Sequence, residues 1–204
     1  MAWFDAKFFG AAFVTLFVIM DPPGIVPLFL ALAGKRTPAE IRRLAIQATL
    51  TAFLVIVSFT VFGERVLEYL GISLPALQGA GGILLLLVSL ELLTGRDSTP
   101  TEVDDVNVAL VPLGTPLLAG PGAIVAAILF ARQADSAAQY VSLGAAIVAV
   151  HVLLLLAMWF SAIIGRVLRP SGISILSRIA GLLLAAIAVQ LIANAIAGFV
   201  HELG

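Results

Sequence analysis

The chain has 204 residues, of which 61% are hydrophobic and only 11% are charged, and its mean hydropathy is +1.15. Soluble domains carry about 25% charged residues, so this composition excludes a soluble globular protein and predicts one that resides in a lipid bilayer. A net charge of −1 gives no clustered basic surface for nucleic acid. The absence of cysteine excludes disulfides and thiolate metal sites.

Six apolar runs are long enough to cross about 30 Å of hydrocarbon as helices. They cover residues 8–33, 42–63, 73–94, 108–131, 140–164 and 174–199. The first run has no clear small-residue cleavage site, so we expect a retained span and not a signal peptide. The connections are too short for a folded domain. The sequence therefore predicts an all-α integral membrane protein with six transmembrane helices.

The basic residues divide unequally between the two sides that six spans would create. One side holds Lys35, Arg36, Arg42, Arg43, Arg96, Arg166, Arg169 and Arg178, and the other holds Lys7, Arg65 and Arg132. Because basic residues accumulate on the cytoplasmic side, this division predicts that both termini are extracytoplasmic. The linker 96–107 is then cytoplasmic. Its carboxylates, Asp97, Glu102, Asp104 and Asp105, are better explained as a solvated segment than as a metal site, and we expect no metal or cofactor.

The two halves of the chain resemble each other at nearly constant spacing. Pro23-Gly24-Ile25 matches Pro121-Gly122-Ala123 at an offset of 98, and Gly82-Ile83-Leu84-Leu85 matches Gly181-Leu182-Leu183-Leu184 at 99. Three helices per repeat is an odd number, so the second repeat enters the bilayer with opposite polarity. The sequence predicts two inverted three-helix repeats, residues 1–95 and 108–204, an arrangement common in secondary transporters.

Each repeat has a helix-breaking stretch near the middle of its first helix. In helix 1 it comprises Asp21, Pro22, Pro23, Gly24 and Ile25, and in helix 4 it comprises Gly120, Pro121, Gly122 and Ala123. A carboxylate in mid-bilayer costs roughly 2.5–3.5 kcal/mol, and prolines remove backbone donors. Such stretches are tolerated where they line a cavity covered by protein or filled with water. We therefore expect helices 1 and 4 to be interrupted near the midplane and to form a substrate-binding site.

The chemistry of these breaks favours a small zwitterion. Helix starts present N–H groups to an anion, and Asp21 supplies the opposite charge, which together would suit an α-amino acid. A cation held by Asp21 and neighbouring carbonyls is an alternative. Asp21 could also be protonated, which would make H⁺ the coupling ion in place of Na⁺. A fourth interpretation is that Asp21 only caps the following helix.

Other polar residues in the spans are less specific. Glu91 and Gln190 occupy corresponding positions and are candidates for gating or coupling, or else interhelical hydrogen-bonding groups. His151 is more simply a packed polar residue. The chain has no nucleotide-binding glycine loop and no visibly paired nucleophile and base, so we do not expect an enzyme.

The motif Asp21-Pro22-Pro23-Gly24-Ile25-Val26-Pro27, together with the segment from Pro112 to Ile124, resembles the MarC (UPF0056-type) family of inner-membrane proteins. The runs Gly81 to Leu85 and Arg178 to Leu184 extend the likeness over almost the whole chain. The resemblance implies a relation to the SnatA transporters of small neutral amino acids and to the LysE exporter superfamily. It also implies an inner-membrane location. Many members have Asn at the position of Asp21, which implies that a hydrogen-bond acceptor can replace the charge.

Two functions remain from this reasoning. The first is a secondary transporter, an exporter or exchanger of small neutral amino acids or similar metabolites, with the bilayer, a substrate and a coupling ion as partners. The second is a structural or partner-binding membrane protein that transports nothing, and either could form a homo-oligomer. We expect Gly122→Leu to abolish transport without unfolding the protein. A geometric alternative makes residues 8–33 and 108–131 re-entrant hairpins and leaves four spans.

Overall fold

The computed structural model describes residues 3–33, 36–94 and 118–203, and this part of the chain contains seven α-helices and no strand. The helices are α1 (Ala6–Met20), α2 (Pro22–Ala33), α3 (Pro38–Leu70), α4 (Leu74–Thr94), α5 (Pro121–Gln133), α6 (Ala137–Trp159) and α7 (Ser161–Leu203). The predicted all-helical class is confirmed. The acidic linker 96–107, the beginning of the predicted fourth span and Lys35 lie outside the described residues.

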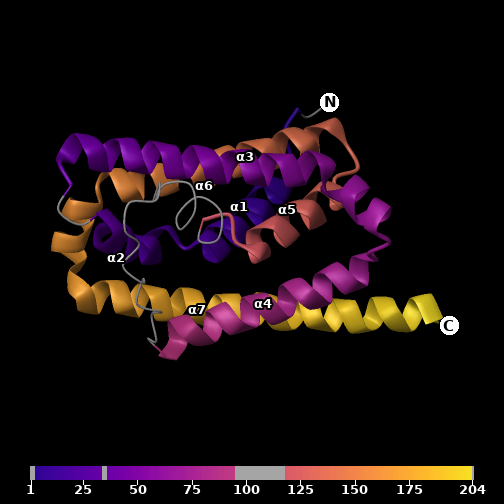
Figure 1. Ribbon diagram of the computed structural model, residues 1–204. Helices are drawn as coiled ribbons and strands as arrows, with labels where there is room; N and C mark the ends of the chain where they lie inside the picture. The colour runs from indigo at the N-terminus through magenta and orange to yellow at the C-terminus, as the bar shows by residue number, and fades with distance from the viewer. Residues whose placement is uncertain (1–2, 34–35, 95–117, 204) are drawn as a thin grey trace.

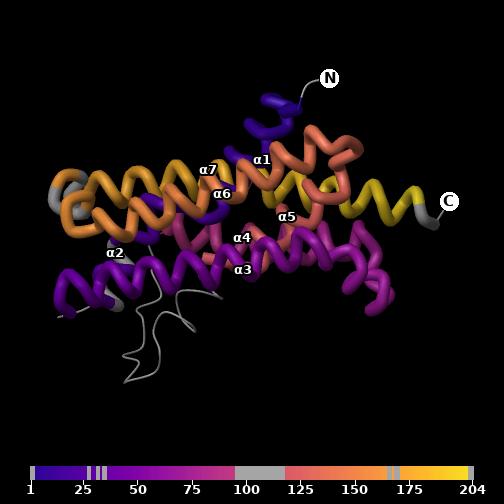
Figure 2. Tube along the Cα trace, turned by 90° about the horizontal axis from the view of Figure 1, so that it is seen from above, coloured from indigo at the N-terminus to yellow at the C-terminus, as the bar shows by residue number. Residues whose placement is uncertain are grey.

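The helices form three layers. In Figure 1, α3 and α6 run along the top, α4 and α7 run along the bottom, and the shorter helices α1, α2 and α5 lie between them. Figure 2 shows the same bundle from above, with the long helices extending in a common direction. The middle layer contacts both outer layers, since α5 packs on α3 and on α4 and α2 packs on α6 and on α7. Both helix breaks therefore lie inside the bundle.

Local sequence explains where several helices begin and end. Thr37 and Glu40 form a capping box at the start of α3, in which the Glu40 carboxylate accepts from the Thr37 N–H at 2.7 Å. Ser136 caps α6 by accepting from the Gln139 N–H at 3.3 Å. Helix α3 ends at Gly71, whose φ of 66° lies in the left-handed region that glycine adopts without strain.

The bottom layer is an antiparallel helix pair packed through glycines. A methyl group added at Gly82 would meet Ile192 Cγ1 at 2.7 Å, and one added at Gly181 would meet Leu92 Cβ at 3.0 Å. Towards the end of α7, Gly198 faces Pro75 in the same way. Positions that rise along α4 meet positions that fall along α7, so the two helices run in opposite directions. Small residues let their backbones approach closely, as is typical of helix pairs in membranes.

The top layer is also antiparallel but packs through larger side chains. The Phe53 ring of α3 meets the His151 ring of α6 edge-on at 5.2 Å, and Arg42 lies 5.0 Å above the Trp159 ring. The main buried cluster joins this layer to the middle one. It includes Leu16, Met20, Phe29, Ile56, Leu118, Ala123, Leu143, Val150 and Leu154.

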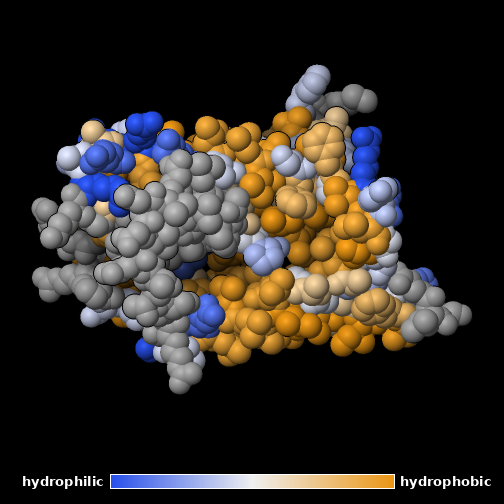
Figure 3. Space-filling model, in the orientation of Figure 1, coloured by the Kyte–Doolittle hydropathy of each residue, from blue (hydrophilic) through white to orange (hydrophobic). Residues whose placement is uncertain are grey.

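Five of the described helical segments are long and apolar enough to span a membrane: Ala6–Val26, Pro38–Leu70, Leu74–Thr94, Ala137–Trp159 and Ser171–His201. Helix α5 is apolar but shorter. Figure 3 shows hydrophilic residues at both ends of the bundle and a hydrophobic belt between them. The chain is thus an integral, multi-pass membrane protein with five candidate spans among the described residues.

Three boundary predictions differ from the structure. Helix α3 continues through Gly63, where its end is predicted, to Leu70, because Gly63 is a packing position against Ile128 and the left-handed cap is Gly71. Helix α7 continues through residues 165–173, where we expected a connection. The hairpin alternative for residues 8–33 is wrong: Asp5 contacts Ser142 near the start of α6, whereas Arg42, just after this segment, contacts Trp159 at the end of α6. Residues 8–33 therefore cross the bundle.

Candidate functional site

The first helix break is a single left-handed residue. Helix α1 ends at Met20, α2 begins at Pro22, and Asp21 between them has φ 40° and ψ 66°. It is the only residue other than glycine with a positive φ in the described part of the chain. Among residues other than glycine, Asp and Asn adopt this left-handed region most readily. Either residue could therefore occupy position 21 without backbone strain. The predicted interruption of helix 1 is present, and it is located at Asp21.

Asp21 holds both helix ends. Its backbone N–H donates to Phe17 O at 3.0 Å, and its carbonyl accepts from the Ile25 N–H at 3.1 Å. Its carboxylate accepts a hydrogen bond from the Gly24 N–H. The capping interpretation of Asp21 is therefore correct as geometry. The other carboxylate oxygen, Oδ2, is buried and has no hydrogen-bond partner.

At the second predicted break the structure describes only the helix that follows, α5. Gly120 precedes α5 with an extended backbone, and Pro121 occupies the first helical position, where its missing N–H is not needed. The Ala123 and Ile124 N–H groups donate to Gly120 O at 3.0 and 3.2 Å. The Gly122 N–H has no acceptor within the helix, because it belongs to the first turn. The residues that would form the first half of helix 4, 108–117, lie outside the described residues.

The fold brings the two breaks together, as the sequence predicted. A methyl group added at Gly122 would lie 3.4 Å from Ile19 Cγ2, two residues before Asp21. Buried residues on both sides of each break share one cluster: Met20 and Ile25 from the first, Ala119 and Ala123 from the second. Residues beside Asp21 and residues at the start of α5 thus lie near each other in the middle layer.

Both helix-start glycines are packed against side chains. A methyl group at Gly24 would collide with the Asp21 carboxylate, and one at Gly122 would collide with Leu85 of α4, with Leu85 Cγ at 2.8 Å. Our expectation for Gly122→Leu therefore needs correction, because a leucine there has no room and would disturb folding as well as any ligand. The glycine at 122 has a packing reason of its own.

The two gating candidates lie elsewhere. Glu91 is exposed on α4, and Gln190 is exposed on α7, so both side chains are on the surface of the bottom layer. Gln190 Nε2 donates to Asn194 Oδ1 at 2.8 Å. Because α7 continues to Leu203, Gln190 is not near the end of its helix. The structure does not bring these two residues to the breaks.

Two buried polar side chains outside the breaks, His151 and Thr49, each have an atom without a hydrogen-bond partner, and the sequence predicted no role for Thr49. His151 is 4% exposed; its Nδ1 donates to Ile147 O at 2.7 Å and its Nε2 has no partner. Thr49 is 8% exposed, and its hydroxyl oxygen is likewise unpartnered. Phe53, which meets the His151 ring, is one helical turn from Thr49 on the same face of α3. A lone buried threonine has no sequence signal that would have revealed it.

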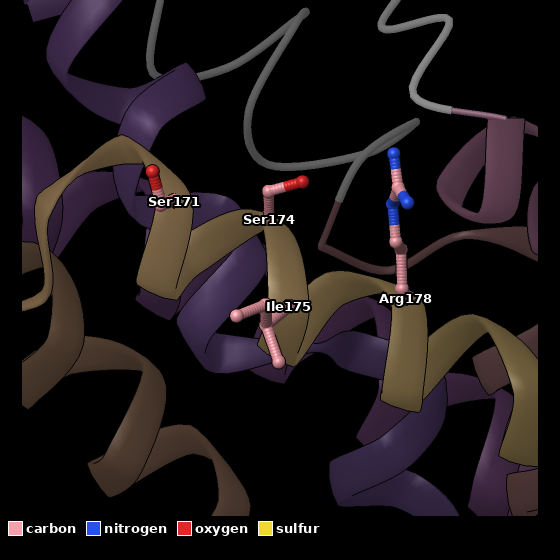
Figure 4. A pocket seen from close by; sticks show the side chains of 4 residues that line it. All are labelled: Ser171, Ser174, Ile175 and Arg178. Carbon is pink, nitrogen blue, oxygen red and sulfur yellow. The ribbon is translucent and has the colours of Figure 1, made fainter.

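A separate hollow of about 440 Å³ opens on α7, lined by Ser171, Ser174, Ile175 and Arg178 (Figure 4). Figure 4 shows its four labelled side chains arising from one face of the helix. The hollow has two hydroxyls and one guanidinium, but it contains none of the predicted site residues. In the described part of the chain, no three His, Cys, Asp or Glu residues are grouped to hold a metal.

An apolar multi-pass bundle whose first span is broken at a carboxylate defines a class: integral membrane proteins with an interrupted helix inside the bundle. The family model for MarC family integral membrane proteins matches residues 6–200. The chain belongs to the MarC family.

Curated relatives align with this chain along almost their whole length. The UPF0056 membrane protein MJ1677 of Methanocaldococcus jannaschii is 37% identical over 95% of this chain and 98% of its own. A UPF0056 membrane protein of Archaeoglobus fulgidus is 36% identical, with 94% and 93% covered. YhcE of Escherichia coli K12 is 29% identical, with 96% and 95% covered. No solved structure matches the chain.

Proposed function

We propose that this protein is a secondary transporter, an exporter or exchanger, of small neutral amino acids or similar small metabolites. The observation that carries the proposal is the Asp21 carboxylate, which is held in a left-handed turn inside the bundle with Oδ2 buried and unpartnered. Leaving a buried acceptor unpaired is costly, and more so in a bilayer, unless a ligand completes it. An ammonium group is a suitable donor for that oxygen.

The two breaks would divide the recognition of such a ligand. The first turn of α2 has no donor to spare, because Pro22 and Pro23 lack N–H groups and Asp21 accepts from Gly24 and Ile25. The start of α5 keeps the Gly122 N–H and the positive end of the helix dipole. The ligand carboxylate would therefore approach α5, and its ammonium group would approach Asp21.

Packing supports the inverted repeat on which alternating access would depend. Thr37 and Ser136, which cap α3 and α6, are 99 residues apart, the offset already found between Gly82 and Gly181. Within the antiparallel pair α4 and α7, a methyl group added at Gly82 would meet Ile192, and one added at Gly181 would meet Leu93 Cγ at 3.2 Å, which are reciprocal contacts under the same offset. We propose that residues 1–95 and 108–204 are the two repeats and that they move around the breaks.

We further propose a cytoplasmic position for the linker 96–107 and extracytoplasmic termini. Asp5 lies beside Ser142 of α6 and Gly198 beside Pro75 of α4, so both ends of the chain are at the same end of the bundle. Lys7, Arg65 and Arg132 belong to that end, and the larger basic group belongs to the other. A coupling ion, H⁺ or Na⁺, would complete the transport cycle.

A second candidate function is a membrane protein that only assembles with partners. The observation in its favour is that Gly24 and Gly122 both have close packing neighbours, so the breaks have a structural explanation without any ligand. Under this alternative no solute would exchange across the membrane.

Counterflow of labelled alanine and glycine in proteoliposomes separates these candidates. The Asp21→Gly variant removes the acceptor and keeps a residue that adopts φ 40° freely, and Asp21→Asn removes only the charge. Asp135→Asn, at the exposed turn before α6, is the matched control. We expect exchange with the wild type and the control and at least a tenfold loss with Asp21→Gly, because about 1.4 kcal/mol of lost binding corresponds to tenfold. No exchange by folded wild-type protein would reject the transporter proposal for these substrates.

The same assay tests proton coupling. If H⁺ is the coupling ion, exchange driven by a pH gradient should exceed exchange without one. Transport that is independent of pH between about 5 and 8 and that requires Na⁺ would assign the coupling to Na⁺ instead.

A further inference from the structure

The outward face of α7 carries two amide side chains within an apolar surface. Gln190 and Asn194 are exposed and hydrogen-bond to each other at 2.8 Å. Their depth is near the middle of the belt, because Ile192 between them lies against Gly82, near the middle of the 21-residue α4. At this depth the surrounding solvent is acyl chain, which can neither donate nor accept hydrogen bonds.

One mutual hydrogen bond leaves much of this amide chemistry unused. A carboxamide has two N–H donors and a carbonyl with two lone pairs. After the bond from Gln190 to Asn194, the Gln190 carbonyl, its second N–H and the Asn194 amino group remain available to an outside partner. Exposed polar groups at this depth are costly, so a surface that covers them with complementary groups is favoured.

The residues around the amides recur at the spacing of a helix pair. Intervals of four and three residues connect an exposed set, here called the α7 seam: Ile179, Leu183, Ala186, Gln190, Ala193, Ala197 and Val200. This is the seven-residue repeat by which two parallel helices pack. Large residues lie at its ends, and alanines flank Gln190. A second helix could therefore approach most closely at the level of the amide.

We propose that the α7 seam binds the α7 seam of a second copy of this chain, forming a parallel homodimer. All copies in one membrane have the same orientation, so a twofold axis along the membrane normal makes the paired helices parallel and places Gln190 against Gln190. An amide is both donor and acceptor and is therefore its own complement, as polar residues in the core of parallel coiled coils are. The seam is on the outer surface, so dimerisation leaves the helix breaks in each copy unobstructed.

Disulfide formation tests this interface directly, because the chain has no cysteine of its own. Ala193→Cys lies on the seam. The matched control is Val152→Cys, because Val152 is 48% exposed and belongs to α6 in the opposite layer. Each variant is oxidised in proteoliposomes at low protein-to-lipid ratio and the fraction of crosslinked dimer is measured on denaturing gels. We expect crosslinking from Ala193→Cys and little from Val152→Cys.

The amides are tested in the Ala193→Cys background. Adding Gln190→Leu and Asn194→Leu should lower the dimer association constant about tenfold, or about 1.4 kcal/mol, whereas Gln190→Asn should retain dimers. These side chains are exposed, so the thermal stability of the monomer in detergent should not fall. Equal crosslinking from both cysteines, no crosslinking from Ala193→Cys, or crosslinking that leucine leaves unchanged would each overturn the proposal. None of these outcomes depends on transport.

Discussion

At the start of α2 the early N–H groups are bonded to Asp21, whereas at the start of α5 the Gly122 N–H has no acceptor within the helix. The start of α2 is capped by the carboxylate of Asp21, the residue directly before that helix. The α5 start is held in place by Leu85 of another helix. The start of a helix inside a membrane bundle can thus be stabilised either by a cap from the preceding residue or by packing against a side chain of another helix. In the proposed function, the start of α5 would therefore supply the hydrogen-bond donor and the start of α2 the acceptor.

Stability should be more sensitive to added side-chain volume at the start of α5 than at the start of α2. Gly122→Ala puts a methyl group against the buried Leu85, and we expect it to lower the free energy of unfolding by about 1–3 kcal/mol, with Gly122→Leu worse. Thermal unfolding in detergent measures this. Gly144→Ala is the control, because a methyl group there meets nothing within 4 Å.

A second substitution checks the cause of that loss. If Leu85 is the obstacle, the double variant Leu85→Ala, Gly122→Ala should lose less stability than the sum of the losses in the two single variants. Strict additivity of the two effects would mean that Gly122 is constrained by something other than this contact.

A substitution at the start of α2 should reduce transport more than it reduces stability. Gly24→Ala forces the Asp21 carboxylate to move, but that group is the far end of a side chain, so we expect a stability loss of at most about 1 kcal/mol. Counterflow should fall by about as much as in Asp21→Gly, and the double variant should be no worse than either single one. A fully active Gly24→Ala would show that the position of the carboxylate is unimportant.

Asp5 provides the smallest effect and a reference for a satisfied carboxylate. It caps α1, and the hydrogen bond from the Phe8 N–H, reinforced by Gln139 and offset in part by desolvation, lowers its pKa below the usual value. A lowered pKa means that this stabilisation is present above about pH 4 and is lost as the pH falls further through the folded-state value.

The measurement is the melting temperature of the wild type and Asp5→Asn against pH. The melting temperature of the wild type should exceed that of Asp5→Asn by a constant amount from pH 5 to 7, and this excess should shrink below about pH 4. A difference that grew on acidification would show that Asp5 is stabilised in its protonated form, contrary to the hydrogen bonds described here.

The sequence predicted the helical class, the first break and the meeting of the two breaks, because a carboxylate and clustered prolines in an apolar run have few structural solutions. It also contained a signal that we did not use. Thr37 with Glu40 and Ser136 with Gln139 share the spacing of a helix N-cap and lie 99 residues apart, and they would have placed the starts of α3 and α6.

Other features depend on tertiary packing and could not be predicted. Nothing in a run of leucines indicates that Leu85, of all of them, would lie against Gly122, or that Phe53 of α3 would meet the ring of His151. The end of α3 and the start of α7 differ from the prediction because hydropathy reports the lipid-facing part of a helix and not how far the helix continues beyond the belt. Sequence patterns report what residues near one another in the chain require, whereas these features depend on contacts between residues that are far apart in the sequence.

The length of α7 makes bilayer thickness a variable for this protein. Its apolar part, Ser171–His201, has 31 residues and rises about 46 Å, against roughly 30 Å of hydrocarbon. Such hydrophobic mismatch is relieved by tilting the helix or by thickening the surrounding lipid. Because α4 is bound to α7 through glycines, a tilt of one helix carries the other with it. Acyl-chain length in a reconstituted membrane would thus set the inclination of the whole bottom layer.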